Sequence, residues 1–248
     1  MPCIVKYWYA VSILLTILYM RQIAIIAGVV VVLGVGGFLY YTRPAPAPSV
    51  DVQQQGAAST ATLAAQAQLG QELYRIVSTE SKAQFEIDET LNGKPTHVVG
   101  ATDQISGEFL YNAENPSQST LGEIRINART LKTDNERRNG TLSRVILRSD
   151  KDENEFVVFK PTSLAGMPQK LAIGESAKVQ VTGDLTVSGV TKSVTFDTTI
   201  KRDSETAVSG TGETKIKYAD FGLTIPSLSF IAWVDEHVVL KMQFVAKK

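Results

Sequence analysis

The chain has 248 residues, and its 25 basic and 25 acidic side chains leave no formal net charge at pH 7. We therefore expect no nucleic-acid partner, because such a protein needs a basic surface to neutralise phosphates. The single cysteine, Cys3, excludes an intramolecular disulfide and a cysteine metal cluster. Two histidines, His97 and His237, are too few for a multi-histidine site, so the sequence predicts neither a metal nor a cofactor.

Residues 1–43 are predicted to form an N-terminal transmembrane anchor. The run from Ile23 to Tyr41 carries no charge, is about long enough to cross a bilayer and ends in two interface-type tyrosines. An earlier apolar run ends at Met20, and the charged Arg21 lies between the two runs, which leaves too short a connection for a helical hairpin, so a start at Met20 is the simpler interpretation. The alternative is a cleaved signal peptide, but the run is longer than a usual signal-peptide core. The sequence predicts a single-pass cell-membrane protein with its folded domain on the extracytoplasmic side, periplasmic or extracellular.

Residues 44–71 are rich in Pro, Ala, Ser and Gln and contain few large apolar side chains. Alternating Pro and Ala favour an extended, stiff chain, and the Ala- and Gln-rich part that follows favours a loose helix. This segment is predicted to be a linker between the membrane anchor and a domain that occupies residues 72–248.

Short alternating runs dominate residues 72–248. Period-two alternation places one face of a strand against an apolar interior and the other in water. The runs cover residues 74–76, 83–87, 104–111, 122–128, 155–160, 178–199, 206–217 and 237–246, with a turn at 92–95. Repeated short strands separated by turns predict a mainly β, antiparallel barrel or sandwich.

One segment departs from this pattern. Residues 133–147 are charged at first, offer Asp134 and Asn135 as N-caps, and then space apolar residues at helical intervals. We expect a short helical crossover that lies over one opening of the barrel. It would serve either as a solvated connection or as a gating lid.

A catalytic site is not indicated. Ser227, Asp235 and His237 supply the residue types of a catalytic triad, but no Gly-x-Ser-x-Gly motif accompanies them. The acidic cluster at 150–155 lacks the spacing of a calcium loop. The sequence therefore predicts a protein that is not an enzyme.

Several motifs occur in an order that resembles the YceI-like family of polyisoprenoid-binding, lipocalin-like barrel proteins. The strongest match is LTVSGVTKSV at residues 185–194, followed by YADFGL at 218–223. Weaker matches are YRI at 74–76, SKAQF at 81–85, GEF at 107–109, Phe159-Lys160, and Arg138 to Leu142, where Asn139 replaces the aspartate usual in the family. The resemblance runs from about Tyr74 to the C-terminus and does not include the anchor or the linker. It implies an exported, lipocalin-like up-and-down β-barrel of about eight strands that holds an isoprenoid or similar amphiphile without converting it.

The apolar residues on the inner faces would either fill a solid core or line a lumen, and the residue types do not separate the two. For a lumen, nine residues are expected to line it and contact the ligand: Phe85, Phe109, Ile126, Phe159, Leu185, Phe196, Phe221, Leu240 and Phe244.

The predicted function is that of a membrane-tethered binding protein. It would hold a polyisoprenoid, of the prenyl-alcohol or quinone type, for storage or transport. The alternative is a ligand-free interaction module that docks on a membrane redox protein. A homodimer is a further expected partnership that the sequence leaves open.

Overall fold

The computed structural model describes residues 51, 52, 63, 70–226 and 231–248. The predicted anchor at 1–43 and most of the predicted linker lie outside these residues. Among the residues described, no helix has both the length and the apolar character needed to cross a bilayer. Five residues of the predicted linker are described (51, 52, 63, 70 and 71), and of these Val52 and Leu63 are buried.

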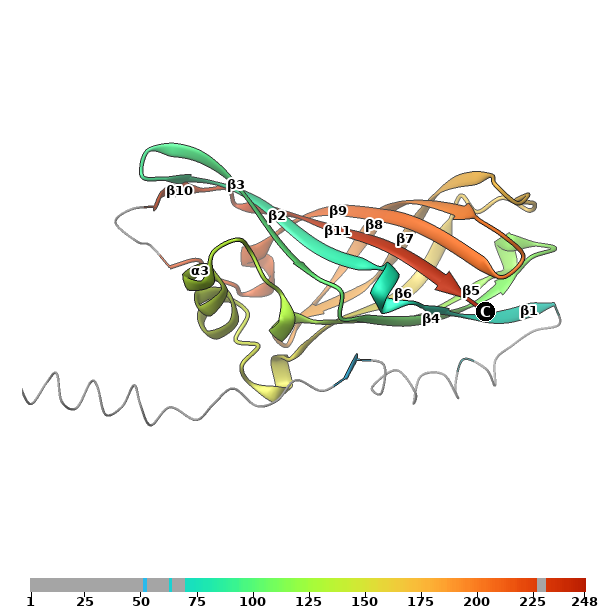
Figure 1. Cartoon of the computed structure of the whole chain (residues 1–248), viewed down its shortest axis with the longest axis horizontal. Coiled ribbons are helices and arrows are strands. Elements are labelled where there is room, and N and C mark those ends of the chain that lie inside the picture. The colour runs from blue at the N-terminus through green and yellow to red at the C-terminus, as the bar shows by residue number, and fades with distance from the viewer. Residues whose placement is uncertain (1–50, 53–62, 64–69, 227–230) are drawn as a thin grey trace, which may run out of the picture. The chain divides into compact units, whose positions relative to one another are not determined.

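In the part of the chain that the structure describes, eleven β-strands form one antiparallel sheet that closes on itself (Figure 1). They are β1 (Gln71–Ile76), β2 (Lys82–Leu91), β3 (Lys94–Thr102), β4 (Ile105–Asn112), β5 (Thr120–Asn127), β6 (Phe156–Ala165), β7 (Ser176–Val187), β8 (Val190–Arg202), β9 (Ala207–Lys217), β10 (Ile231–Val234) and β11 (His237–Lys247).

These strands occupy eight positions around the barrel, because three positions are each built from two consecutive segments. β1 and β2 form one such position and are separated by the turn η1 (Ser78–Glu80); β3 with β4 and β10 with β11 form the other two. β11 pairs with β9 on one side and with β2 and β1 on the other, which closes the barrel. The order around the barrel otherwise follows the chain, so the predicted up-and-down, mainly β architecture is confirmed.

Two tight turns set the register of their hairpins. Asn92-Gly93 joins β2 to β3, and Ser188-Gly189 joins β7 to β8. All four residues have positive φ (50°, 75°, 47° and 81°), as a two-residue type I′ turn requires. The predicted turn at 92–95 was too long. Lys94 instead begins β3, a strand that the sequence patterns did not indicate.

The long connection between β5 and β6, residues 128–155, is helical and is called the crossover. It contains η3 (Ala128–Thr130), α3 (Glu136–Thr141), the π-helical turn η4 (Leu142–Ile146) and η5 (Asp152–Asn154). The predicted short helix is therefore present. Asn135 caps it, because its side-chain oxygen accepts hydrogen bonds from the backbone N–H groups of Arg137 (3.0 Å) and Arg138 (3.2 Å).

The crossover and the turns at 92–93 and 188–189 lie at one end of the barrel, which we call the crossover end (left in Figure 1). The turn η6 (Tyr218–Phe221) follows β9 at this end as well. The opposite end, the loop end, carries the connections 113–119, 166–175 and 203–206, the first of which contains η2 (Pro116–Gln118).

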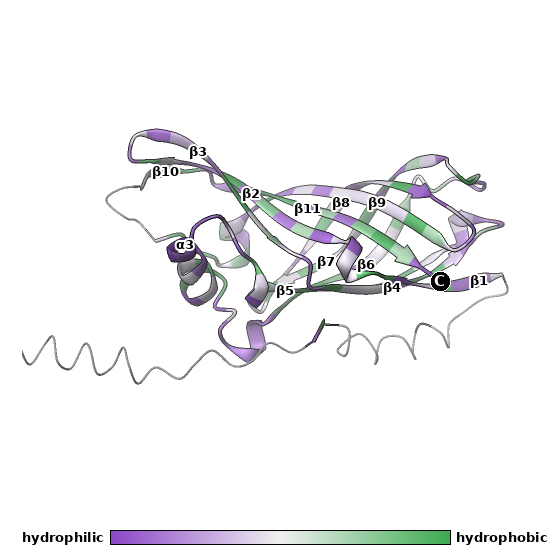
Figure 2. Cartoon of the chain, viewed as in Figure 1, coloured by the Kyte–Doolittle hydropathy of each residue, from purple (hydrophilic) through white to green (hydrophobic). Residues whose placement is uncertain are grey.

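Apolar and polar residues alternate along many of the strands (Figure 2). Among the residues described, most of the buried apolar side chains belong to one of two clusters. The larger includes Phe159, Leu185 and Phe221, and the smaller includes Tyr74 and Tyr111.

Candidate functional site

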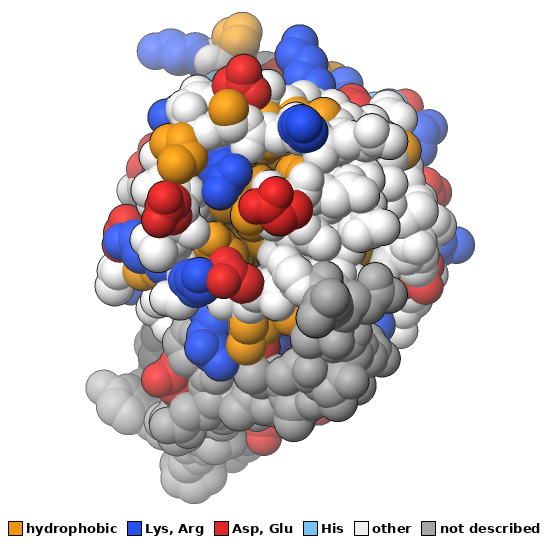
Figure 3. Space-filling model, turned by 90° about the vertical axis from the view of Figure 1, so that its right-hand side faces the viewer, with side chains coloured by type: hydrophobic (Ala, Val, Ile, Leu, Met, Phe, Trp, Pro, Cys, Tyr) orange, Lys and Arg blue, Asp and Glu red, His pale blue; other side chains and the backbone are white. Residues whose placement is uncertain are grey.

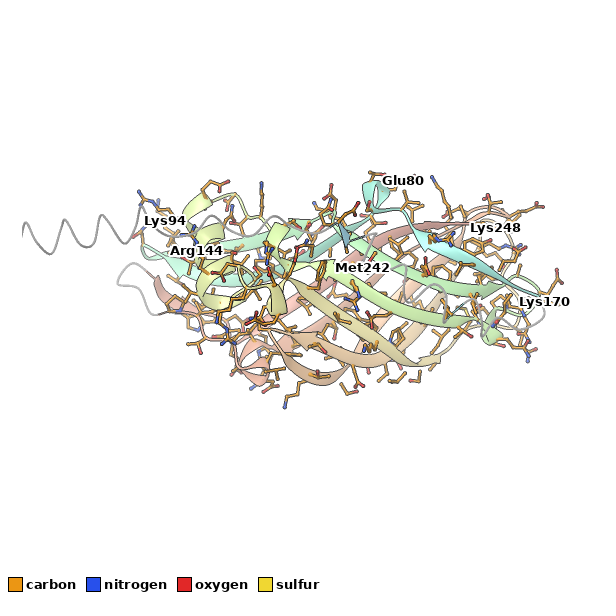
Figure 4. The ribbon with its side chains drawn as sticks, turned by 90° about the horizontal axis from the view of Figure 1, so that it is seen from below. Glu80, Lys94, Arg144, Lys170, Met242 and Lys248 are labelled. Carbon is orange, nitrogen blue, oxygen red and sulfur yellow. The ribbon has the colours of Figure 1, made fainter. Side chains whose placement is uncertain are left out.

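The barrel encloses an apolar cavity of about 190 Å³. One buried water needs roughly 10–15 Å³ of such space, so the cavity is far larger than a packing defect. All eight barrel positions contribute lining residues. The lining extends from Leu131 in the crossover to Ser119 and Met167 in the loops of the opposite end. Met242, labelled near the middle of the barrel in Figure 4, lines the cavity between these ends.

Eight of the nine residues expected to line a lumen lie on the cavity wall: Phe85, Phe109, Ile126, Phe159, Leu185, Phe196, Leu240 and Phe244. They come from seven different strands, and the barrel closure brings them together. Phe221 is not among the lining residues. It lies in η6, is only 1% exposed, and belongs to a core cluster with Leu142 and Leu147 of the crossover.

The sequence patterns missed other lining residues. They include Ile76, Ile124, Val179, Val181, Ile200 and Met242. All but Ile76 lie an even number of residues along the same strand from a residue that was named, and Ile124 and Met242 lie two residues from one. The alternation that identified Ile126 or Leu240 was therefore sufficient to find them.

Glycines opposite phenylalanines keep the cavity open. Phe85 is directly opposite Gly100, and Phe244 is directly opposite Gly210. A Cβ atom added to Gly100 would lie 2.1 Å from Cε1 of Phe85, and one added to Gly210 would lie 2.7 Å from the ring of Phe244. The phenyl rings thus occupy the space that a neighbouring side chain would take and lie over the barrel wall. The same aromatic residues opposite larger partners would extend further into the lumen.

A model of the YceI-like domain matches residues 74–246. The chain belongs to the YceI-like domain family. The match covers more than half of the chain and coincides with the barrel.

Two solved structures have the same fold as this YceI-like domain. A polyisoprenoid-binding domain from Saccharophagus degradans, implicated in plant cell wall breakdown, is 18% identical with a TM-score of 0.55, and the alignment covers 70% of this chain and 97% of that one. BcnA from Burkholderia cenocepacia is 19% identical with a TM-score of 0.53, with 69% and 99% covered. No curated protein sequence matches the chain.

In this YceI-like domain a buried polar network fixes the crossover end. Glu155 is 3% exposed and accepts a hydrogen bond from Nδ2 of Asn127 (3.1 Å), while Nη1 of Arg129 lies 3.5 Å from its other oxygen. Nε of Arg129 donates to the carbonyl of Ser149 (2.7 Å). Ser188, in the β7–β8 turn, donates to the carbonyl of Leu147 (2.6 Å). These bonds hold the crossover against the strands that it covers.

At the loop end of the YceI-like domain three aromatic rings lie together. Tyr74 stacks on Phe109, with centroids 5.7 Å apart, and meets the edge of Tyr111 at 5.6 Å. Phe109 and Tyr111 line the cavity. Figure 3 views the molecule from this end and shows apolar side chains within a hollow bordered by charged ones. The cavity therefore has an apolar approach at the loop end.

The residues considered for catalysis do not form a site in the described part of the chain. His237 lies on β11, with Nδ1 3.4 Å from Asp235, whereas Ser227 lies outside the described residues. His97 lies on β3 and pairs with Asp88 at 2.7 Å. Within the described residues no group of three or more His, Cys, Asp or Glu could hold a metal ion.

Proposed function

We propose that this YceI-like domain binds one polyisoprenoid, or a similar amphiphilic lipid, inside its barrel. The observation that carries the proposal is the apolar cavity that runs between the two ends of the barrel. A solid interaction module would have filled this volume with side chains, since protein interiors are normally close-packed. The cavity thus favours the ligand-binding interpretation over the ligand-free one.

Burial of the hydrocarbon chain is sufficient to give useful affinity. Each CH₂ group moved from water into the cavity contributes about 0.8 kcal/mol. Ten such groups contribute about 8 kcal/mol, which corresponds to micromolar binding before the cost of ordering the chain. The cavity wall is apolar and partly aromatic, as burial of a hydrocarbon chain requires. Within it, the rings of Phe159 and Phe196 meet edge to face with centroids 5.1 Å apart.

The structural relatives support the lipid class. One of the solved structures with the same fold is of a polyisoprenoid-binding domain. This chain would hold its lipid without chemical conversion, for storage or transport.

The location proposed for the domain is the outer side of the cell membrane, where the uncharged run at residues 23–41 would tether it. A tethered barrel stays close to the bilayer in which such lipids dissolve. Protease treatment of spheroplasts, whose cytoplasmic membrane is intact and whose outer side is accessible, tests this location. Cleavage of the barrel before the spheroplasts are lysed is expected, and protection until lysis would contradict it.

Native mass spectrometry of the purified full-length protein tests the binding. We expect a mass excess that organic extraction releases as a prenyl lipid. Phe196→Asp should abolish this excess by placing a charge in the cavity wall. Thr195→Asp, on the exposed face of the same strand, is the matched control and should retain the lipid. A bare polypeptide mass that remains after incubation with prenyl alcohols and quinones would overturn the proposal.

A further inference from the structure

Two residues of the predicted linker are buried outside the core of the barrel. Leu63 is 7% exposed and Val52 is 0% exposed, and both belong to the compact unit that contains the barrel. Neither residue is a member of the two apolar core clusters, and neither lines the cavity. A linker free in water would leave such side chains exposed. Their burial therefore indicates that this part of the chain packs against another surface of the protein.

The surface that Leu63 contacts is the outer wall of the barrel at a β-bulge between β4 and β5. A register shift there leaves Glu108 of β4 opposite two residues of β5, Gly122 and Glu123. A Cβ atom added to Gly122 would lie 3.1 Å from Cδ2 of Leu63. The backbone of Gly122 lines the cavity and Leu63 does not, so Leu63 lies on the outer side of this strand. It packs against backbone that no side chain of residue 122 covers.

Gly122 differs from the other glycines that make room for a side chain. Gly100 and Gly210 leave space on the inner face of the wall for phenylalanine rings, whereas Gly122 leaves space on the outer face for Leu63. The φ angle of Gly122 is outside the left-handed region, so the backbone conformation alone does not require a glycine. An added Cβ would also lie 2.5 Å from the carbonyl oxygen of Glu108. A larger residue would therefore disturb the bulge, the seat of Leu63, or both.

The outer wall beside Gly122 is more covered than the outer wall formed by β8. The side chains of Glu108 and Glu123 are only 14% and 15% exposed, although they are charged and lie outside the barrel. On β8 the outward residues Thr195 and Asp197 are exposed. Charged side chains on a bare barrel wall are normally in contact with water. The difference is expected if a second segment of the protein packs at the β4–β5 bulge.

We propose that the outer wall at the β4–β5 bulge is a docking surface for the chain's own linker, with Leu63 seated against Gly122. The linker is the occupant because Leu63 lies a short way before β1, which begins at Gln71, so docking closes only a short loop at a small entropic cost. Docking at Leu63 shortens the stretch of chain that can act as a spacer. It thus restricts how far, and in which direction, the barrel can move from the N-terminal segment. This inference does not depend on lipid binding.

Thiol labelling of the full-length protein tests the docking. In a Cys3→Ser background, a maleimide is applied to Leu63→Cys and to Thr195→Cys, which places the control thiol on the exposed face of β8. A docked segment must open before it reacts, so Leu63→Cys should react about tenfold more slowly than the control, and urea should make the two rates equal. Equal rates without urea would overturn the proposal. The protection should also be independent of protein concentration. Protection that disappears on dilution would mean that the linker docks on a second copy of the chain, and would overturn docking within one chain.

Hydrogen exchange identifies the seat without altering the barrel. Leu63→Asp should release the linker and speed amide exchange beside the bulge, at residues 121–124, about three- to tenfold. Exchange in β7 and β8 should not change, which shows that the barrel remains folded. Leu63→Met is the matched control, because it keeps an apolar side chain of similar volume and should preserve the slow exchange. Unchanged exchange at residues 121–124 in Leu63→Asp would exclude this part of the wall as the docking surface.

Discussion

At the crossover end, the buried side chains of Asn127, Arg129 and Glu155 hydrogen bond or pair with one another and with the crossover backbone. At the loop end, the equally buried hydroxyl of Tyr111 has no partner among the described residues. The two ends are therefore expected to contribute differently. Paired buried groups hold a chain segment in one place, whereas an unpaired buried donor lowers the stability of the folded protein.

The largest expected effect comes from breaking the network at the crossover end. Arg129→Met leaves the buried carboxylate of Glu155 without its cation, and removing one partner of a buried ion pair costs about 3–5 kcal/mol. Urea unfolding should show this loss. Arg137→Met, on the exposed side of α3, is the control and should change the free energy of unfolding by less than about 0.5 kcal/mol. Equal effects of the two substitutions would show that the network does not stabilise the crossover end.

The space between the two ends should depend on Gly100. An alanine there would place its Cβ 2.1 Å from the ring of Phe85, which must then turn into the cavity. We expect a stability loss of about 1–3 kcal/mol. Affinity for a prenyl alcohol should fall about ten- to thirtyfold, as two or more CH₂ contacts are lost. Titration of the lipid with the folded variant measures the second effect.

Two further variants test whether the clash with Phe85 causes the loss of affinity in Gly100→Ala. Gly100→Ala combined with Phe85→Leu removes the clash and should recover most of the affinity. Gly140 has no atom within 4 Å of an added Cβ, so Gly140→Ala should leave binding unchanged and slightly favour helix α3. An unaltered affinity in Gly100→Ala would mean that the ring of Phe85 does not shape the cavity.

The pairing of Phe85 with Gly100 also shows how much of the structure could be predicted from the sequence. The alternation of apolar and polar residues was sufficient to predict most strands and eight of the nine named residues that line the cavity. It did not predict β3, because Pro95 and Gly100 interrupt the alternation in that strand. Treating Asn92-Gly93 as a two-residue turn would have placed Phe85 opposite Gly100 and indicated an open interior. Register therefore carries information that residue types alone do not.

Two other features were beyond sequence reasoning. Phe221 is a large apolar residue like those that line the cavity. Only the position of η6 in the structure shows that it packs at the crossover end instead. The hydroxyl of Tyr74 has a backbone carbonyl within reach and that of Tyr111 has none, which depends on the conformation of the loop containing Glu205. No local pattern encodes that distance.

A smaller effect separates the two tyrosines in the lipid-free protein. Tyr74→Phe removes the hydrogen bond to Glu205 and should lower the free energy of unfolding by about 1 kcal/mol. Tyr111→Phe removes an unpaired buried hydroxyl, so stability should be unchanged or slightly higher. Urea unfolding of both variants after delipidation measures this. A loss in Tyr111→Phe as large as that in Tyr74→Phe would remove the difference between these hydroxyls.

The smallest expected effect is that of pH on stability. Burial raises the pKa of Tyr111 above the ordinary value of 10.0, so the hydroxyl keeps its proton and should leave the free energy of unfolding constant between about pH 6 and 9. The folded state holds this proton more tightly than the unfolded state. The stabilisation is therefore present below the unfolded pKa and is lost as pH rises through the folded pKa. Urea unfolding of the lipid-free protein across this range, with Tyr111→Phe alongside, measures the loss. A loss above about pH 10 that is equally large in Tyr111→Phe would assign it to a different titrating group.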